Sequence, residues 1–597
     1  MPERGIRMLR KYKAASIQYN PTLHAKKENI QDLLKLSTEA AENGAKLIVM
    51  PEMATTGYCF YDRDEIKAYV EPVPGPTTFE FEKVASAYNC YIVIGLAEVD
   101  PETDIYYNTG VLIGPDGFIG KYRKTHHFVT ETRYAKDGDL GFPVFDTEIG
   151  KIGCLICMDH YFFEPSRIMA LQGVEVLCNP TNWNEEKSPA PCWFTRAWEN
   201  GMYIISANRS DQERGNRFSG GSSILKPDGE ILSYIDDGIG IIYGEVDLDQ
   251  TKKKQTLSGI NKLNDRQVGH YKSLNLNIYL NNPYYVHRLY AEDSLPEGKG
   301  SKISVFQFYP EPFNIERNLM KIKEGARSAA KNKSELLVLP EHSVTGNAVS
   351  HSDALNMAED LNEGNLIKEL SSIANKSNLN MVLSIVEKEK EKLFHTVVLI
   401  NGNGLIGKYR KIHLNKVESK WATRGEDGFK FFDLPLGRVG LLSGDDSMFP
   451  ESTMSLAVWG ADVIAIPASV REPLPLPLQA TKVPLLPERT ILQDDPVHWH
   501  LWRTRAVETN TFVAFANQIG EGGMGYSGIF GPIDWPRQEV LLDSEEKAIH
   551  YQIDTTSQND VYPDKLVRVK ELVRMRYPHL YDRLLVKNPV SQELSQV

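Results

Sequence analysis

The sequence predicts an α/β protein, rich in β-structure, that carries one layered fold twice. Two observations support this prediction. Several segments of the first half recur in the same order in the second half, and within each half apolar, strand-like runs alternate with amphipathic, helix-like segments. The chain has 597 residues, beyond the size at which one hydrophobic core stops growing, so at least two domains are expected.

The internal repeat is carried by motifs at matching spacings. A glutamate precedes a lysine by 72 positions in the first half and by 70 in the second, and 33 further positions lead in each half to the end of a strand-like run. These positions are Glu52, Lys124 and Cys157 in the first half and Glu341, Lys411 and Gly444 in the second. The paired motifs are KLIVMPEMATTGY and ELLVLPEHSVTGN, GKYRKTHHF and GKYRKIHL, ETRYAKDGDLGFPVFD and ESKWATRGEDGFKFFD, RAWEN and RAVET, and NNPYYVHRLY (281–290) and MRYPHLYDRL (575–584).

Domain boundaries follow from the stretch between the two copies. The segment AEDSLPEGKGSK is acidic, contains Pro and Gly and lacks apolar periodicity, which is typical of a linker. We therefore expect a first domain at residues 1–290, a linker at 291–301 and a second domain at 302–597.

The second copy carries an insertion. The separation between Cys157 and Arg196 is 39 positions, whereas the matching separation between Gly444 and Arg505 is 61. The second copy therefore has about 22 extra residues. They fall in the Pro- and Leu-rich stretch 471–496, whose prolines exclude a helix or a central strand. Two interpretations stay open: an ordered excursion packed on its own domain, or a flap that reaches towards the first copy's site.

Local patterns predict the elements of each copy. Residues 27–43 place apolar side chains on one helical face and end before Gly44, and the apolar run KLIVM that follows predicts a buried strand. Further strand-like runs are YIVIGLAEV, NTGVLI, KIGCLIC, VEVLCN and MYIISANR. The PDG sequences at 115–117 and 227–229 predict hairpin turns.

Composition excludes several classes of partner. The 67 Lys and Arg against 79 Asp and Glu give a formal charge of -12, which argues against nucleic acid and anionic membranes as ligands. No segment is apolar for long enough to span a membrane, and the first residues do not form a secretory signal. All six cysteines lie in the first 192 residues, and we expect them to be reduced thiols in a cytoplasmic protein.

Three residues of the first half have the chemistry needed to cleave an amide. Cleavage requires a nucleophile, a base that removes its proton, and positive or hydrogen-bonding groups where the carbonyl oxygen becomes anionic. Cys157 at the end of an apolar strand supplies the thiol, and Glu52 after another apolar run would be poorly solvated, with a pKa raised towards the range of a proton carrier. For the oxyanion, Lys124 supplies a fixed positive charge and the backbone N–H of Met158 supplies a hydrogen-bond donor.

These motifs, PE at 51–52, KYRKTH around Lys124 and ICMD around Cys157, resemble those of the nitrilase superfamily of carbon–nitrogen hydrolases. The resemblance extends over essentially the whole chain, twice. It implies two tandem copies of a four-layer α-β-β-α sandwich. It also implies that Glu131, seven positions after Lys124, is a second catalytic glutamate with a role in substrate positioning or water activation.

The substrate class follows from finer detail. Nitrile-cleaving members of the family carry CWE at the nucleophile, whereas the CMD of this chain resembles the amidase and carbamoylase branches, as does ETRYAKDGDLGFPVF. We expect hydrolysis of a small linear amide or N-carbamoyl compound through a thioester, with release of ammonia. Candidate substrate-binding residues are Asn182, Trp183, Met158 and Tyr58. For Asn182 and Trp183 a capped turn with an aromatic residue packed beneath it is an equally open interpretation.

Alternative functions remain at this stage. Within the same chemistry they are a nitrilase, and a nitrilase-like glutaminase or acyl transferase. A non-catalytic binding protein is disfavoured because the first copy keeps the whole set of residues.

Other motifs are weak. Cys154 and Cys157 form a CxxC, but residues three apart on a strand face opposite ways and no second CxxC is present; Leu441 replaces Cys154 in the second copy, which favours core packing. HWH (498–500) could supply two metal ligands but lacks a third and a fourth at a recognisable spacing. GEGGMG (520–525) is not followed by GK, so it is not a phosphate-binding loop, and the GxSxG motif of serine hydrolases does not occur. We expect neither a metal nor another cofactor.

The second copy retains Glu341, Lys411 and Glu418 but has Gly444 in place of the nucleophile, so we expect it to be catalytically inactive. Ser443 is one position away and is not expected to substitute. The family resemblance implies oligomers formed near the helix after the nucleophile. The second copy could therefore be an intramolecular partner of the first, through EPSRIMALQG (164–173) and ESTMSLAVWG (451–460), and a further homo-oligomer stays open.

Overall fold

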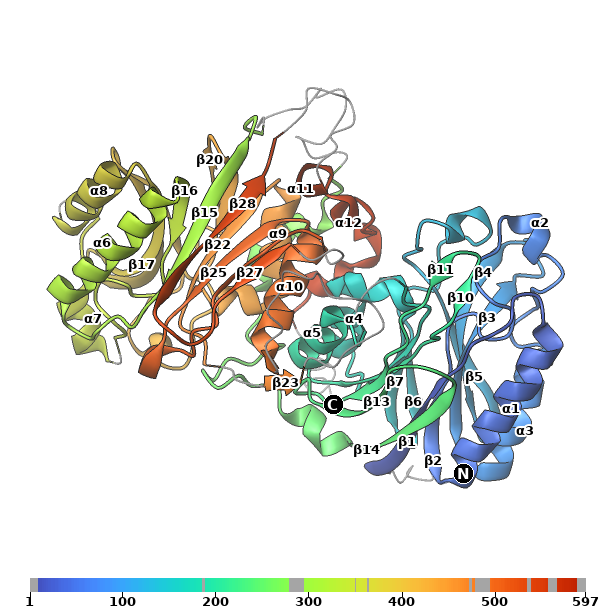
Figure 1. Cartoon of the computed structure of the whole chain (residues 1–597). Helices are drawn as coiled ribbons and strands as arrows, with labels where there is room; N and C mark the ends of the chain where they lie inside the picture. Colours follow the sequence, from blue (N-terminus) through green and yellow to red (C-terminus); the bar gives the residue numbers. More distant parts are fainter. Residues whose placement is uncertain are drawn as a thin grey trace. The chain divides into compact units, whose positions relative to one another are not determined.

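Two compact units make up the chain. The computed structural model describes residues 9–184, 188–278, 295–348, 350–361, 364–471, 475–477, 494–533, 538–556 and 566–587. One unit contains Met1–Lys254, and the other contains Gln255–Leu474 and Pro496–Lys587. Each unit holds two six-stranded sheets, so the repeat that is visible in the sequence is also a repeat of the fold (Figure 1).

The first unit is built on two mixed sheets, with the strand orders β14-β1-β2-β3-β4-β5 and β13-β12-β9-β8-β7-β6. In the middle of each sheet three strands run parallel, β1-β2-β3 and β7-β8-β9. Both predicted PDG turns form hairpins, β4-β5 and β12-β13. The strands are β1 (Lys11–Gln18), β2 (Ala45–Val49), β3 (Tyr91–Val99), β4 (Tyr106–Gly114), β5 (Gly117–Arg123), β6 (Val144–Thr147), β7 (Gly150–Cys154), β8 (Val176–Pro180), β9 (Tyr203–Ala207), β12 (Ser222–Leu225), β13 (Ile231–Ile235) and β14 (Gly240–Asp247).

Helices cover the outer faces of both sheets in the first unit. The helices α1 (Lys26–Glu42) and α3 (Pro76–Tyr88) pack on the first sheet, and α4 (Phe163–Leu171) and α5 (Pro191–Asn200) pack on the second (Figure 1). The inner faces of the sheets are close together: a Cβ atom on Gly110 would lie 2.5 Å from the Cys154 Sγ atom. The layers are therefore α-β-β-α, as the family resemblance implied, and Cys154 is buried where the two sheets meet.

The second unit repeats this arrangement with the strand orders β19-β18-β17-β16-β15-β28 and β20-β21-β22-β25-β26-β27. Its strands are β15 (Gly300–Gln307), β16 (Ser334–Val338), β17 (Asn380–Glu389), β18 (Lys392–Asn401), β19 (Gly404–Arg410), β20 (Lys430–Leu434), β21 (Gly437–Leu441), β22 (Val463–Ala468), β25 (Phe512–Asn517), β26 (Gly528–Phe530), β27 (Glu539–Leu541) and β28 (Lys547–Asp554). Its main helices are α6 (Ile315–Lys331), α8 (Leu366–Ser377), α9 (Pro450–Val458) and α10 (Val497–Thr509).

Short elements form the connections. They are α2 (Arg63–Ile66), β10 (Gln212–Glu213), β11 (Asn216–Arg217), α7 (His351–Met357), α11 (Leu566–Val569), α12 (Glu571–Arg574), and the 3-10 turns η1 (Glu131–Arg133), η2 (Cys157–Tyr161), η3 (Leu248–Lys252), η4 (Val268–His270), η5 (Lys272–Asn275), η6 (Glu418–Lys420), η7 (Asp446–Met448), η8 (Gly520–Gly522), η9 (Pro578–Leu580) and η10 (Asp582–Leu585). No helix in the described ranges combines the length and the apolar character that a membrane crossing requires.

The predicted insertion at 471–496 lies largely outside the described residues. Two short strands are described within it, β23 (Pro475–Pro477) and β24 (Asp494–Pro496), and they pair with each other. The two interpretations of the insertion are therefore still predictions.

The tail of the first repeat belongs to the second unit. The division lies after Lys254, earlier than the boundary at 290 suggested by the linker composition, and residues 279–294 are not described. Side-chain contacts explain the difference. The Ser258 hydroxyl donates to Asp445 at 3.2 Å, and the Tyr271 hydroxyl lies 2.6 Å from His413 Nε2. Turn-forming composition marks where a chain can bend, but packing decides which unit a segment joins.

The tails of the two repeats exchange equivalent contacts inside the second unit. The Arg266 guanidinium donates to the Leu584 carbonyl, and the Arg576 guanidinium donates to the Leu274 carbonyl at 2.8 Å. Both tails contain two 3-10 turns, η4 and η5 in one and η9 and η10 in the other. Among the described residues, the stretch equivalent to 575–584 is therefore 265–274. Residues 281–290, which the sequence pairs with 575–584, lie outside the described residues. A contact in which each partner gives the other the same bond is the hallmark of a two-fold interface.

Candidate active site

The predicted catalytic residues of the first unit follow the ends of its central strands. Glu52 comes after β2, which is parallel to β1 and β3, and Cys157 comes after β7, which is parallel to β8. Lys124 directly follows β5. Residues that follow parallel strands meet at one edge of a sheet, so side chains far apart in the sequence can converge there.

A fully buried ion network joins three of these residues. The Lys124 ammonium donates to Glu52 Oε1 at 2.8 Å and to Glu131 Oε2 at 2.5 Å, and none of the three side chains is exposed. Sequence reasoning missed the fourth member, Asn108 of β4, whose side-chain amide donates to Glu52 and to Glu131 at 2.6 Å each. No motif marked Asn108, because the second repeat has His395 at the matching position.

Cys157 lies beside this network in a strained backbone conformation. It is the first residue of η2 and has φ of +46°, in the left-handed region that side chains rarely adopt. Burial raises the pKa of its thiol, and the Glu52 charge adds to the rise, while Lys124 and the Thr181 hydroxyl oppose it. The thiol is therefore neutral at neutral pH and needs a base to become a nucleophile.

The two buried carboxyl groups have pKa values that move in opposite directions. Burial raises the pKa of Glu52 to about 7, although Lys124 and Asn108 act against the rise. Burial also penalises the charged form of Glu131, but Lys124 and His127 outweigh it, so the pKa of Glu131 is lowered. A pair whose environments separate its pKa values divides into one proton carrier and one permanently charged group. Of the two, Glu52 has the pKa suited to carrying a proton near neutral pH.

Asp159 fixes the turn that carries Cys157. Its carboxylate accepts hydrogen bonds from the Ile156 N–H at 2.9 Å, from the His126 N–H at 3.0 Å and from the Tyr122 hydroxyl at 2.8 Å. The interaction with the His126 side chain lowers its pKa despite burial. Asp159 therefore holds the backbone around Cys157.

The four candidate substrate-binding residues differ in their contacts and burial. Asn182 contacts Glu52 directly: its N–H donates to the carboxylate at 2.8 Å and its side-chain amide to the Glu52 carbonyl at 3.1 Å. Met158 follows Cys157 and is partly exposed. Trp183 is buried and stacks on Tyr161 with ring centroids 5.0 Å apart. Tyr58 is buried, and burial together with the nearby Glu131 charge raises the pKa of its hydroxyl.

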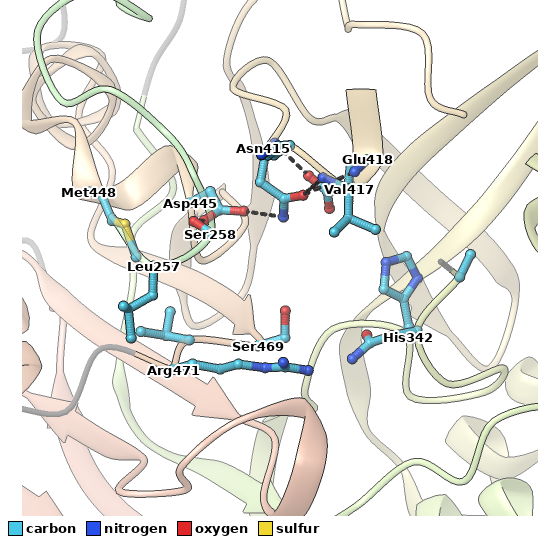
Figure 2. Close-up of a pocket in the computed structure, with 14 residues that line it drawn as sticks. Leu257, Ser258, His342, Asn415, Val417, Glu418, Asp445, Met448, Ser469 and Arg471 are labelled. Atoms are coloured by element: carbon cyan, nitrogen blue, oxygen red, sulfur yellow. Dashed lines mark hydrogen bonds between the residues drawn. The ribbon is translucent and has the colours of Figure 1, made fainter. Parts of the chain in front are cut away.

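In the second unit the same residue types form a different network. The Lys411 ammonium lies 2.7 Å from Glu418 and 2.6 Å from Asp445, but 3.7 Å from Glu341. Asp445 stands where the first repeat has Met158, and Figure 2 shows its side chain reaching towards Asn415 and Glu418. The retained lysine is thus paired with a new carboxylate instead of the glutamate that follows β16.

The place of the missing nucleophile is occupied by neighbouring atoms. Gly444 lacks the positive φ of Cys157, and a Cβ atom built on it would lie 3.0 Å from Ala468 Cβ. The Gly444 N–H donates to Glu341 at 3.2 Å. Ser443 is no substitute nucleophile, because its hydroxyl donates to Asp446 at 2.9 Å. These contacts support the expectation of an inactive second site.

Comparisons with known proteins agree with the repeat. The model of the carbon-nitrogen hydrolase family matches residues 13–255 and again 302–533. A nitrilase of Pyrococcus abyssi is 40% identical over 257 residues, which cover 42% of this chain and 95% of that protein. Omega-amidase NIT2 of Homo sapiens is 31% identical over 37% of this chain and 84% of its own length. N-carbamoylputrescine amidase of Solanum lycopersicum is 31% identical over 41% of this chain and 89% of its own length. Among solved structures, Saccharomyces cerevisiae Nit3, a member of branch 10 of the nitrilase superfamily, is similar at 26% identity and a TM-score of 0.38 over 41% of this chain and 93% of that one.

Replacing Lys124 with Met tests the ion network. The change leaves Glu52 and Glu131 buried without a counter-charge, so we expect the free energy of unfolding to fall by about 3–5 kcal/mol near neutral pH. Without Lys124, the pKa of each carboxyl group is higher in the folded protein than in the unfolded chain. The loss of unfolding free energy therefore grows as the pH rises above the pKa of the unfolded chain. Chemical denaturation at pH 5 and pH 8 measures it. A loss that is the same at both pH values would contradict the assigned charges.

Proposed function

The chain belongs to the carbon-nitrogen hydrolase family of the nitrilase superfamily, and we propose that its first repeat hydrolyses a small linear amide or N-carbamoyl compound through a thioester on Cys157, with release of ammonia. The observation that carries the proposal is the buried Glu52, Lys124 and Glu131 network around a thiol held at φ of +46°.

In the first step the Glu52 carboxylate accepts the thiol proton, and the Cys157 sulfur attacks the carbonyl carbon. The carbonyl electron pair moves to oxygen, and the Lys124 ammonium and the Met158 N–H stabilise the resulting anion. The N–H groups of the first residues of a helix have no partner within that helix, so the position of Met158 as the second residue of η2 suits this role. Glu52 then gives its proton to the nitrogen, the C–N bond breaks, and ammonia leaves.

In the second step water replaces ammonia. Glu52 removes a proton from the water, the hydroxide attacks the thioester carbon, the C–S bond breaks, and the sulfur regains the proton from Glu52. Glu131 suits a positioning role better than proton transfer, because its pKa is lowered and its oxygens accept from Lys124, Asn108 and the Phe128 N–H. Asn182 likewise positions Glu52 through two hydrogen bonds.

The choice of amides over nitriles rests on two supports. The nucleophile motif is CMD, which resembles the amidase and carbamoylase branches. The relatives include proteins named omega-amidase and N-carbamoylputrescine amidase, although another is named nitrilase.

We also propose that the second repeat serves as the intramolecular partner of the first. The reciprocal bonds of Arg266 and Arg576 support this, because identical exchanged contacts are what a two-fold pair of equivalent chains forms.

A substrate panel tests the reaction. Wild-type protein and Cys157→Ala are assayed for ammonia release from short amides, carbamoyl amines and nitriles. We expect turnover of an amide or carbamoyl compound by the wild type and none above the buffer blank for Cys157→Ala. Cys154→Ala, which removes a buried thiol three positions away, is the matched control and should retain turnover. Turnover by Cys157→Ala, or turnover of nitriles alone, would contradict the proposal.

The pH profile tests the role of Glu52. Because Glu52 must be ionised to accept the thiol proton and its pKa is about 7, kcat/KM should rise with pH through neutrality and then level off. The raised pKa of the thiol keeps Cys157 protonated over the same pH range, so the rise of kcat/KM reflects the ionisation of Glu52. Glu52→Gln should lower kcat/KM by about 100- to 10,000-fold. A profile that is flat between pH 5 and pH 9 would count against this assignment.

Gly444→Cys tests whether the second site can be restored. Its Cβ would meet Ala468 at 3.0 Å, and the backbone there lacks the conformation of Cys157. We therefore expect Gly444→Cys in a Cys157→Ala background to release no ammonia. Turnover by this double variant, measured with the preferred substrate of the wild type, would show that the second site is inactive only because it lacks a thiol.

A further inference from the structure

The second site differs from the first by more than the loss of its thiol. Two positions around the retained glutamates and lysine carry histidine: His342 replaces Met53, and His395 replaces Asn108. Met53 and His342 share the same unusual backbone angle, with φ of +49° and +47°. Loss of the nucleophile therefore coincides with the gain of two imidazole rings in the same place.

These rings and a carboxylate form a compact group of metal-ligand atoms. One atom each from His342, His395 and Glu418 lies within 4.8 Å of the others, and they are the one such group of His, Cys, Asp and Glu found among the described residues. The ring centroids of the two histidines are 4.2 Å apart, and His395 Nδ1 lies 2.5 Å from Glu418 Oε1. Two imidazoles and one carboxylate are a common ligand set for Zn²⁺.

The interactions of the two rings differ. His342 is 3% exposed, and its Nδ1 atom has no hydrogen-bond partner among the described residues. The backbone N–H of His342 donates to the Ser384 hydroxyl at 2.8 Å, and His395 Nε2 lies 3.0 Å from the same hydroxyl. A buried nitrogen without a partner is costly, and a bound cation would remove that cost.

The local charge is negative. Glu341, Glu418 and Asp445 all lie within 3.7 Å of the single buried Lys411 ammonium. Lys411 opposes a cation beside Glu418, but Asp445, which the first repeat lacks, lies 2.6 Å from it and offsets its charge. Lys416 and Arg471 also line the pocket, yet both are exposed and screened by water.

A pocket gives access to the group. His342, Glu418 and Asp445 line a cavity of about 310 Å³, together with Leu257 and Ser258 from the tail of the first repeat (Figure 2). Three protein ligands leave a fourth position of a tetrahedral metal open, as in zinc sites that exchange a ligand.

We propose that the second repeat binds one divalent transition metal ion, of the class of Zn²⁺, through His342, His395 and Glu418. The site uses the fold of the lost active site for coordination. This proposal is independent of the reaction assigned to the first repeat.

Metal binding to the full chain tests the proposal. Protein freed of metal with a chelator is titrated with Co²⁺, which shows visible absorption when four-coordinate, and Zn²⁺ is then added as competitor. We expect one equivalent of Co²⁺ to bind and Zn²⁺ to displace it. The variant His342→Met, His395→Asn carries the side chains with which the first repeat folds. It should weaken Co²⁺ binding by at least about 100-fold, which is more than the loss of a residue that only hydrogen-bonds to a metal ligand would cause. Wild-type protein that binds no metal would overturn the proposal.

Two controls separate this site from other ligands of the chain. Cys157→Ser removes the thiol of the first repeat, and His351→Ala removes an exposed histidine; neither should change Co²⁺ affinity. If circular dichroism shows that the double histidine variant does not fold, His342→Met alone is used instead, and we expect the same loss of Co²⁺ binding. Undiminished binding in the folded histidine variant, or binding lost in Cys157→Ser, would overturn the proposal.

Discussion

One buried ammonium group between two carboxylates organises the first unit. Lys124, Glu52 and Glu131 are completely buried, and charges in so apolar a place are tolerated only when they are paired and hydrogen-bonded. Asn108 satisfies both carboxylates at once, and Asn182 holds the remaining Glu52 oxygen. The loops after β2, β5 and β8 are thereby tied to one point, beside which the turn after β7 carries Cys157.

This constraint also explains why the two glutamates differ. They share a lysine and an asparagine, yet the pKa of Glu52 is raised and that of Glu131 is lowered. A single ammonium cannot compensate two buried carboxylates fully, so one remains close to protonation near neutral pH. That residue is the one suited to pass a proton between the thiol, the leaving nitrogen and water.

The second unit keeps the same constraint without the thiol. Lys411 is still buried and still needs carboxylates, but Asp445 now supplies one of them, and Glu341 lies 3.7 Å away. Glu341 instead contacts the backbone of Gly444, and Ala468 lies against that glycine. Conserved residue types at conserved spacings therefore do not imply a conserved arrangement, because one added carboxylate redirects the lysine.

The sequence by itself determined the repeat, the layered α/β fold, and the set Glu52, Lys124, Glu131 and Cys157, because these depend on apolar periodicity and on spacings that survive in both halves. Packing decided the rest. Asn108 and the group of His342, His395 and Glu418 become visible only when strands distant in sequence are placed side by side. The boundary after Lys254 and the packing of the first tail in the second unit likewise depend on long-range contacts of Ser258, Tyr271 and Arg266, which no local pattern encodes.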